Sequence, residues 1–185
     1  MMGVVHERQL VPRLVRSQLF SDERGWFQQI YADDLSAGGG TLAGMRFVQD
    51  NASLSVKPGT VRGLHFQLPP SAQDKLVTVL AGAIYDVAVD IRRSSPNFGR
   101  HDAVELRAGT GDQFFIPAGF AHGFMTLEPN TVVFYKVSRP YAPRDERGIA
   151  WNDPALGIAW PMTAEVLSTK DASLPALGDA AELFP

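Results

Sequence analysis

Glycine and proline divide this chain into short segments, and that spacing limits what it can fold into. The 17 glycines and 13 prolines fall among 185 residues, or roughly one position in six. Segments this short suit strands of 3–10 residues better than helices. The clearest segment is residues 75–92, KLVTVLAGAIYDVAVDIR, in which Val87, Val89 and Ile91 alternate with other residues. Period two with β-branched residues predicts a half-buried strand, and we expect it to form a hairpin with the preceding run across residues 81–82.

Similar β-rich runs recur along the chain, with Gly, Pro, Asn and Asp between them. The further predicted strands are Met45–Gln49, Thr60–Gln67, Ala103–Arg107, Gln113–Ile116, Gly123–Leu127 and Thr131–Val137. Eight or more short strands favour a single all-β sandwich or barrel. Helix is expected only over Tyr31–Ala37 and in one turn opened by Asp153 and Pro154. We expect an N-terminal arm over about 1–45, a core over about 46–140 and a C-terminal segment over about 141–185 that wraps the surface.

Composition excludes several classes of protein. The net charge is −3, from 17 Lys and Arg against 20 Asp and Glu, and no basic run is long enough to track a nucleic acid. No apolar run approaches the roughly 20 residues that span a bilayer. The first residues interrupt their apolar stretches with charge, unlike a signal peptide. No cysteine is present, which excludes disulfides and thiolate chemistry. We therefore expect a cytoplasmic protein that binds neither nucleic acid nor membrane.

One strand–turn–strand motif is typical of the cupin jelly roll. Residues 111–122, GDQFFIPAGFAH, place a glycine, then Pro-x-Gly, and then His122 three residues later. In metal-binding cupins that histidine is a ligand, together with a His-x-His and an acidic residue on an earlier strand. The earlier strand here, RGLHFQLP over 62–69, offers only His65. With four histidines in all and no thiols, a three-ligand site lacks donors, so we expect no bound metal.

A longer series of motifs resembles the dTDP-4-dehydrorhamnose 3,5-epimerase family. In order, the runs are FSDERGWF (20–27), FVQDNASLS (47–55), VRGLHFQLPP (61–70), KLVTVLAGAIYDVAVDIRRSSPNFG (75–99), IPAGFAHGF (116–124), FYKVSRPYAP (134–143), ERGIAWNDP (146–154), IAWP (158–161) and LSTKD (167–171). The resemblance implies a cupin-type jelly roll that epimerises a dTDP-4-keto-6-deoxy sugar in dTDP-rhamnose biosynthesis. It also implies no cofactor, because the substrate's ketone is the electron sink. A homodimer is implied as well, with an N-terminal strand joining the partner's sheet.

The resemblance assigns four residues to the chemistry. His65 matches the general base, and an imidazole is basic near pH 7. Asp171 matches the carboxylate that orients this histidine. Tyr135 matches the acid on the opposite face of the sugar, and Lys75 matches the cation near the carbonyl oxygen. Outside these motifs each has an ordinary structural interpretation: a core histidine, a surface carboxylate, a strand tyrosine and a strand-start lysine.

The resemblance also assigns substrate-binding residues. Arg24 and Arg62 match diphosphate contacts, and Tyr141 matches the aromatic side chain that stacks on thymine. The other matching positions are Gln49, Asp50, Asn51, His122, Glu146 and Lys170. Outside these motifs, the charged residues among them would ordinarily be interpreted as part of a solvent-exposed face.

Two positions depart from the family pattern. Gln29 stands where the family usually has a glutamate near the nucleotide base, and Pro140 replaces an aromatic residue before Tyr141. An amide keeps hydrogen bonding but brings no charge, so base preference is the property most affected.

Three alternative functions remain open at this point. One is an epimerase that inverts only carbon 3 or only carbon 5. Another is a non-catalytic jelly roll that binds nucleotide sugars. A metal-dependent cupin oxygenase or isomerase is disfavoured by the missing His-x-His.

Overall fold

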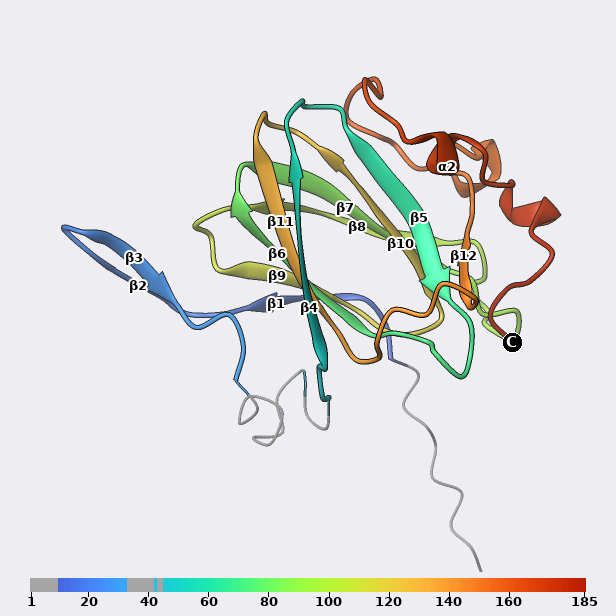
Figure 1. Ribbon diagram of the computed structural model, residues 1–185, viewed down its shortest axis with the longest axis horizontal. Coiled ribbons are helices and arrows are strands. Elements are labelled where there is room, and N and C mark those ends of the chain that lie inside the picture. Colours follow the sequence, from blue (N-terminus) through green and yellow to red (C-terminus); the bar gives the residue numbers. More distant parts are fainter. Residues whose placement is uncertain (1–9, 33–41, 43–44) are drawn as a thin grey trace, which may run out of the picture.

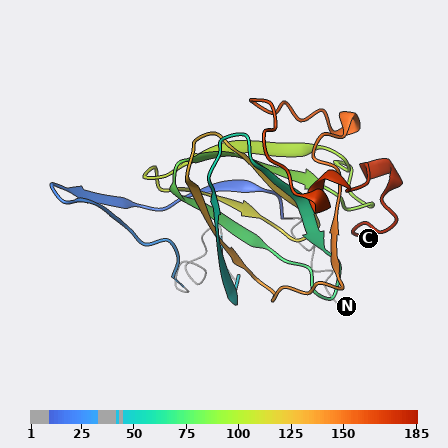
Figure 2. The same ribbon diagram turned by 45° about the horizontal axis from the view of Figure 1, so that its top comes forward.

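The computed structural model describes residues 10–32, 42 and 45–185, which form two five-stranded antiparallel sheets packed face to face (Figures 1 and 2). The first sheet contains, in spatial order, β1 (Arg13–Arg16), β9 (Asp112–Ile116), β6 (Lys75–Ala81), β11 (Thr131–Val137) and β4 (Gln49–Ser55). The second contains β12 (Glu146–Gly148), β5 (Val61–Gln67), β10 (Phe120–Thr126), β7 (Ala83–Asp90) and β8 (His101–Arg107). The remaining elements are the hairpin β2 (Leu19–Asp22) and β3 (Gly25–Gln28), the 3₁₀ turns η1 (Pro154–Leu156) and η2 (Leu177–Asp179), and α2 (Thr169–Ala172). This is the predicted all-β jelly roll.

Alternation along the strands sorts side chains between the interior and the two outer faces. The space between the sheets is filled by one cluster of buried residues: Val77, Val79, Ile84, Ala88, Leu106, Phe114, Ile116, Phe120, Phe124 and Val133. On β10, His122 lies between Phe120 and Phe124 of this cluster and points to the same face. On β7, Asp86 lies in the same way between Ile84 and Ala88. The alternation that buries the apolar side chains therefore also directs these polar groups into the interior.

The outer face of the second sheet is covered by the C-terminal segment. Leu64 and Phe66 of β5 pack in one buried cluster with Leu156, Leu177 and Leu183 from that segment. In Figure 1 the segment crosses beside β5 and carries α2 next to it. Burying these apolar side chains ties the tail to the roll and brings α2 within reach of the end of β5.

The predicted hairpin over residues 75–92 is wrong. β6 lies in the first sheet and β7 in the second, so the chain crosses between sheets where a tight turn was expected. Gly82 makes this crossing with φ +76°, and a Cβ there would lie 3.0 Å from the Cα of Thr131. The half-buried strand is also wrong, because Asp86 and Asp90 on its polar side are as buried as its valines. Both faces of β7 are covered, so alternation could not identify a solvent face.

Among the other local predictions, most of the strands and the turn at Asp153 are confirmed, whereas one strand and the predicted helix are not. Predicted strands correspond to β5, β8, β9 and β10 with shifted ends, and the prediction for β11 matches at both ends. The predicted strand Met45–Gln49 is wrong because β4 begins only at Gln49. Asp153 opens η1 as expected, its side chain accepting a hydrogen bond from the backbone N–H of Ala155. Within the predicted helix Tyr31–Ala37, residues 31 and 32 are not helical, and 33–37 lie outside the described residues. No helix in the described part of the chain is long and apolar enough to cross a membrane.

Candidate active site

Two adjoining cavities are lined by residues of both sheets. One has a volume of about 410 Å³ and the other about 320 Å³. Three side chains line both cavities: His65 from the second sheet, and Lys75 and Tyr135 from the first. The histidine therefore approaches the shared space from one sheet, and the amine and the phenol approach it from the other.

Local backbone geometry places His65 beside His122. The two residues are direct cross-strand partners on β5 and β10. Gly63 adopts φ +122°, and a Cβ there would meet the Cα of Gly123 at 2.6 Å. The two strands can approach this closely because neither position carries a Cβ atom. The close approach places both imidazoles in the lining of the same cavity.

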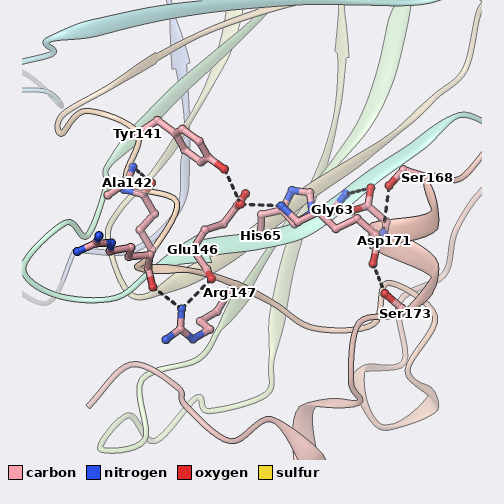
Figure 3. A network of polar contacts seen from close by, with 12 residues as sticks. Gly63, His65, Tyr141, Ala142, Glu146, Arg147, Ser168, Asp171 and Ser173 are labelled. Atoms are coloured by element: carbon pink, nitrogen blue, oxygen red, sulfur yellow. Dashed lines mark hydrogen bonds and ion pairs between the residues drawn. The ribbon is translucent and has the colours of Figure 1, made fainter.

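His65 is held by a carboxylate from the distant C-terminal segment (Figure 3). Its Nε2 lies 2.6 Å from Oδ1 of Asp171, 106 positions later in the sequence. The Oδ2 of Asp171 accepts a 3.4 Å hydrogen bond from the backbone N–H of Gly63, and Ser168 caps α2 by accepting from the N–H of Asp171 at 3.0 Å. An Nε2–H that donates to Asp171 leaves Nδ1 of His65 as the basic nitrogen.

The electrostatics of this pair keep the carboxylate ionised. Burial by itself would raise the pKa of Asp171, but the hydrogen bonds from His65, Gly63 and Ser168 lower it below its ordinary value. The side chain of Asp171 is 5% exposed, while that of His65 is 26% exposed. Asp171 is therefore buried and holds the imidazole in place, while His65 remains accessible from the cavity, as a general base must be.

Lys75 and Tyr135 bring an amine and a phenol into the same space. Burial lowers the pKa of Lys75 to about 8, against the opposing effect of nearby carboxylates. Its Nζ lies 3.5 Å from the backbone oxygen of His65. Burial raises the pKa of Tyr135, so its hydroxyl keeps its proton at neutral pH. One group can stabilise negative charge on oxygen and the other can give up a proton.

His122 forms a second histidine–carboxylate pair, and its partner Asp86 was missed from the sequence. His122 Nε2 lies 2.7 Å from Oδ1 of Asp86, with side chains 7% and 0% exposed. Burial lowers the pKa of His122, which favours the neutral ring. A carboxylate within a run of valines and alanines on β7 was the available signal, but alternation placed it on the wrong, polar side.

The second cavity is bordered by Tyr141 and Glu146, which are joined by a hydrogen bond (Figure 3). Oε2 of Glu146 accepts a hydrogen bond from the hydroxyl of Tyr141 at 2.7 Å and from Nζ of Lys170 at 2.6 Å. Burial opposes ionisation of Glu146, but these two donors lower its pKa below the ordinary value. Gln49 and Asn51 of β4 line the same cavity, and Gln49 Oε1 accepts from the backbone N–H of Tyr141 at 2.9 Å.

Eleven of the fourteen residues predicted for the site line one or both cavities. They are Gln49, Asn51, Arg62, His65, Lys75, His122, Tyr135, Tyr141, Glu146, Lys170 and Asp171. Arg24 lies instead at the turn of the β2–β3 hairpin, paired with Asp22 at 2.5 Å and 84% exposed. Asp50 alternates to the other face of β4, where it binds Nζ of Lys136 at 2.6 Å. Gln29 is exposed just after β3. These three are not brought to the cavities within one chain.

Across residues 10–32, 42 and 45–185, no group of three or more His, Cys, Asp or Glu is arranged to hold a metal ion. The two cavity histidines instead each contact a single carboxylate through Nε2. What the arrangement offers is proton transfer: an oriented base on one sheet faces a proton donor and a cation on the other.

Comparison with known proteins gives this arrangement a context. Residues 12–179 match the family model described as dTDP-4-dehydrorhamnose 3,5-epimerase. The protein of that name from Sinorhizobium fredii is 51% identical over 166 residues, covering 89% of this chain and 84% of the relative. The crystal structure of the Bacillus anthracis enzyme with TDP and PPi bound has 47% identity and a TM-score of 0.83, covering 89% of this chain and 93% of that chain. The Legionella pneumophila dTDP-6-deoxy-D-glucose-3,5-epimerase, solved in complex with dTDP-4-keto-L-rhamnose, has 42% identity and a TM-score of 0.84, covering 90% and 88%.

Proposed function

The chain belongs to the dTDP-4-dehydrorhamnose 3,5-epimerase family, and from this we infer that it is an isomerase with that activity. It converts dTDP-4-keto-6-deoxy-D-glucose to dTDP-4-keto-L-rhamnose by inverting carbons 3 and 5. The observation that carries this proposal is the dyad of His65 and Asp171 on one sheet, facing Tyr135 and Lys75 on the other. The same proposal places the enzyme in the cytoplasm and treats residues 1–185 as one domain with an arm, a core and a C-terminal wrap.

The proposed reaction begins with removal of the proton next to the ketone. Nδ1 of His65 takes the proton from carbon, while its Nε2–H donates to Asp171. The electron pair moves onto the carbonyl oxygen, where the ammonium of Lys75 stabilises the enolate. Tyr135 then protonates the carbon from the opposite face, which inverts it. The substrate's own ketone holds the electrons throughout, so the steps need no redox cofactor.

The remaining cavity residues are proposed to bind the nucleotide. Arg62 lines the larger cavity and offers its guanidinium to the diphosphate. Tyr141 is 52% exposed and presents a ring face for thymine, with Gln49 and Asn51 beside it. Lys170 and Glu146 are proposed to bind near the sugar and diphosphate, and His122 is proposed to contact the sugar. Because Gln29 replaces an acidic residue, discrimination between bases is the property we expect to differ from the family.

The position of Arg24 supports a homodimer. The β2–β3 hairpin projects away from the roll in Figures 1 and 2, and it exposes the aromatic side chains of Phe20, Trp26 and Phe27. Strand β4 ends the first sheet without a further partner among the described residues, beside exposed Leu54. We propose that the hairpin covers this region of a second copy, which carries Arg24 to the partner's cavity.

Proton exchange tests the activity directly. The protein is incubated with dTDP-4-keto-6-deoxyglucose in deuterated water, and a ketoreductase then traps the product for NMR. Deuterium at carbons 3 and 5 in an L-sugar is the expected result. Deuterium at one carbon would replace this proposal with a one-centre epimerase. Binding without exchange would leave a non-catalytic nucleotide-sugar-binding module.

A mixing experiment tests the dimer and the location of Arg24 together. Arg24→Ala and His65→Ala are each expected to be strongly impaired as pure proteins. In mixed dimers, the chain that keeps His65 receives Arg24 from its partner, which restores one complete site per dimer. If mixing restores no activity although mixed dimers are shown to form, Arg24 does not act across the interface.

A further inference from the structure

Asp86 is a buried charged group that the proposed steps do not use. It lies on β7 with a side chain 0% exposed, in contact with His122, which lines the larger cavity. Its Oδ1 accepts a hydrogen bond from His122, whereas its Oδ2 is buried with no hydrogen-bond partner. An ionised carboxylate is costly to bury unless other charges compensate it. Asp86 acts electrostatically on Lys75, which lines the same cavity as His122.

Six titratable groups from six different strands surround this part of the cavity. Lys75 of β6 is faced by Asp86 of β7 and Glu146 of β12, and His122 of β10 is influenced by both Lys75 and His65 of β5. Tyr135 of β11 lines the same cavity. Among the carboxylates, Asp86 has the larger effect on Lys75 and Glu146 the smaller, and both oppose the effect of burial.

We propose that Asp86 is a positioning residue for the reaction: it keeps Lys75 in the ammonium form and fixes the tautomer of His122. The inference rests on the proposed function, because an enolate oxygen is what the ammonium would stabilise. Accepting the Nε2–H of His122 leaves Nδ1 of that ring as an acceptor for a sugar hydroxyl. One buried carboxylate thus sets the charge of one substrate contact and the hydrogen-bonding direction of another.

The protonation of Lys75 can be measured without any activity assay. The chain contains only four lysines, Lys57, Lys75, Lys136 and Lys170, so protein labelled with ¹³Cε-lysine gives a simple spectrum. The Lys75 signal, identified by its loss in Lys75→Met, is expected to titrate at about pH 8. In Asp86→Asn its midpoint moves to lower pH, and in Glu146→Gln it moves by less.

Asp90→Asn is the matched control. Asp90 lies four residues further along β7 and is also buried, but it pairs with Arg92 at 2.6 Å and does not face Lys75. This variant removes a buried charge from the same strand, and the Lys75 midpoint should stay at the wild-type value. An unchanged Lys75 midpoint in Asp86→Asn, or an equal shift in Asp90→Asn, overturns the proposal.

The pH profile of kcat/KM gives a second readout. In Asp86→Asn the amide oxygen still accepts from His122, so activity at low pH is largely kept while the alkaline limb moves to lower pH. Each pH unit of that movement lowers the ammonium fraction about tenfold at pH values above the midpoint. A uniform loss at all pH values would mean that Asp86 has only a structural role.

The unaltered protein provides a test that does not depend on any variant at Asp86 folding. Nitrogen-15 NMR of the four histidines, with His122 assigned through His122→Asn, should show Nε2 protonated and Nδ1 free. The opposite tautomer overturns the proposal. If wild-type enzyme exchanges no deuterium, the proposed function fails. If wild-type enzyme is active but the titration midpoint of Lys75 is the same in wild type and in Asp86→Asn, only this inference fails.

Discussion

The two histidine–carboxylate pairs at the cavity are built in different ways. His65 on β5 pairs with Asp171, which arrives from the C-terminal helix 106 positions later, whereas His122 on β10 pairs with Asp86 on the neighbouring strand β7, 36 positions away. The first pair has a histidine 26% exposed, and the second has one 7% exposed. The pair of His65 and Asp171, which joins β5 to the C-terminal segment, is accessible from the cavity. The pair of His122 and Asp86, which joins two strands of one sheet, is buried beneath the cavity surface.

This difference in exposure predicts that the two histidine–carboxylate pairs have different roles. An accessible imidazole with a buried carboxylate behind it is suited to accept protons, and a buried neutral imidazole is suited to hold a substrate group in place. It also predicts that the pair of His65 and Asp171 depends on the docking of the tail, because Asp171 belongs to the C-terminal segment that covers β5. The experiments below test these two consequences.

The largest effect is expected from removing the two imidazoles in turn. His65→Ala should abolish deuterium exchange at both carbons, with a rate loss of about 10²–10⁴, because one base serves both steps. His122→Ala should mainly raise KM and keep exchange. His101→Ala is the control, since that ring contacts the backbone oxygen of Leu156 outside the cavities. A greater loss of exchange in His122→Ala than in His65→Ala would reverse the assignment.

Removing the proton donor opposite the base should separate exchange from inversion. Tyr135→Phe is expected to keep deuterium exchange by His65 but to slow the formation of inverted product by about 10²-fold. NMR of the sugar products distinguishes the two outcomes. Tyr85→Phe is the matched control, because Tyr85 packs against Trp160 on the outer face of the second sheet. Normal turnover by Tyr135→Phe would show that another group is the acid.

A smaller effect is expected from neutralising the carboxylate behind the base. Asp171→Asn keeps the size of the side chain but removes the charge that stabilises the imidazolium, so kcat should fall about 10–100-fold. Asp153→Asn is the control, since Asp153 caps η1 in the same C-terminal segment without contacting the cavity. If both variants lose activity equally, docking of the tail explains the effect and orientation of His65 does not.

The same carboxylate should contribute to stability in a pH-dependent way. The pKa of Asp171 is lower in the folded protein than its ordinary value of about 3.9 in an unfolded chain. Its contribution is therefore complete above the unfolded pKa and is lost as the pH falls through the folded pKa. Urea unfolding should show wild type more stable than Asp171→Asn at pH 6, with the difference shrinking below pH ~4. A constant difference across this range would contradict the linkage.

The smallest effect is expected at the cap of α2. Ser168→Ala removes the acceptor for the N–H of Asp171 and should cost about 1 kcal/mol of stability, measured by urea unfolding. Activity should fall only a few-fold, because His65 and Gly63 still hold Asp171. Ser173→Ala, at the exposed end of the same helix, is the control. Equal effects of the two changes would show that the cap does not position Asp171.

The predictions from sequence succeeded where the information is local. Alternation of period two and turn residues identified most core strands, and the Asp153–Pro154 pair identified η1. Both signals are local, because the alternation of a strand and the start of a helical turn depend on residues that are close in sequence. The order and number of family motifs pointed to eleven residues that the fold does bring to two adjoining cavities. Their individual roles remain predictions.

The sequence alone therefore determined that the chain is all-β and that it belongs among dTDP-sugar epimerases. Only the tertiary structure decided that β6 and β7 separate into opposite sheets, that Asp86 is buried beneath His122 and that Arg24 lies away from its own cavity. The physical reason is the range of the interactions involved. Side-chain alternation is set within a few residues, whereas sheet membership, burial on both faces and contacts between distant strands depend on which surfaces pack together.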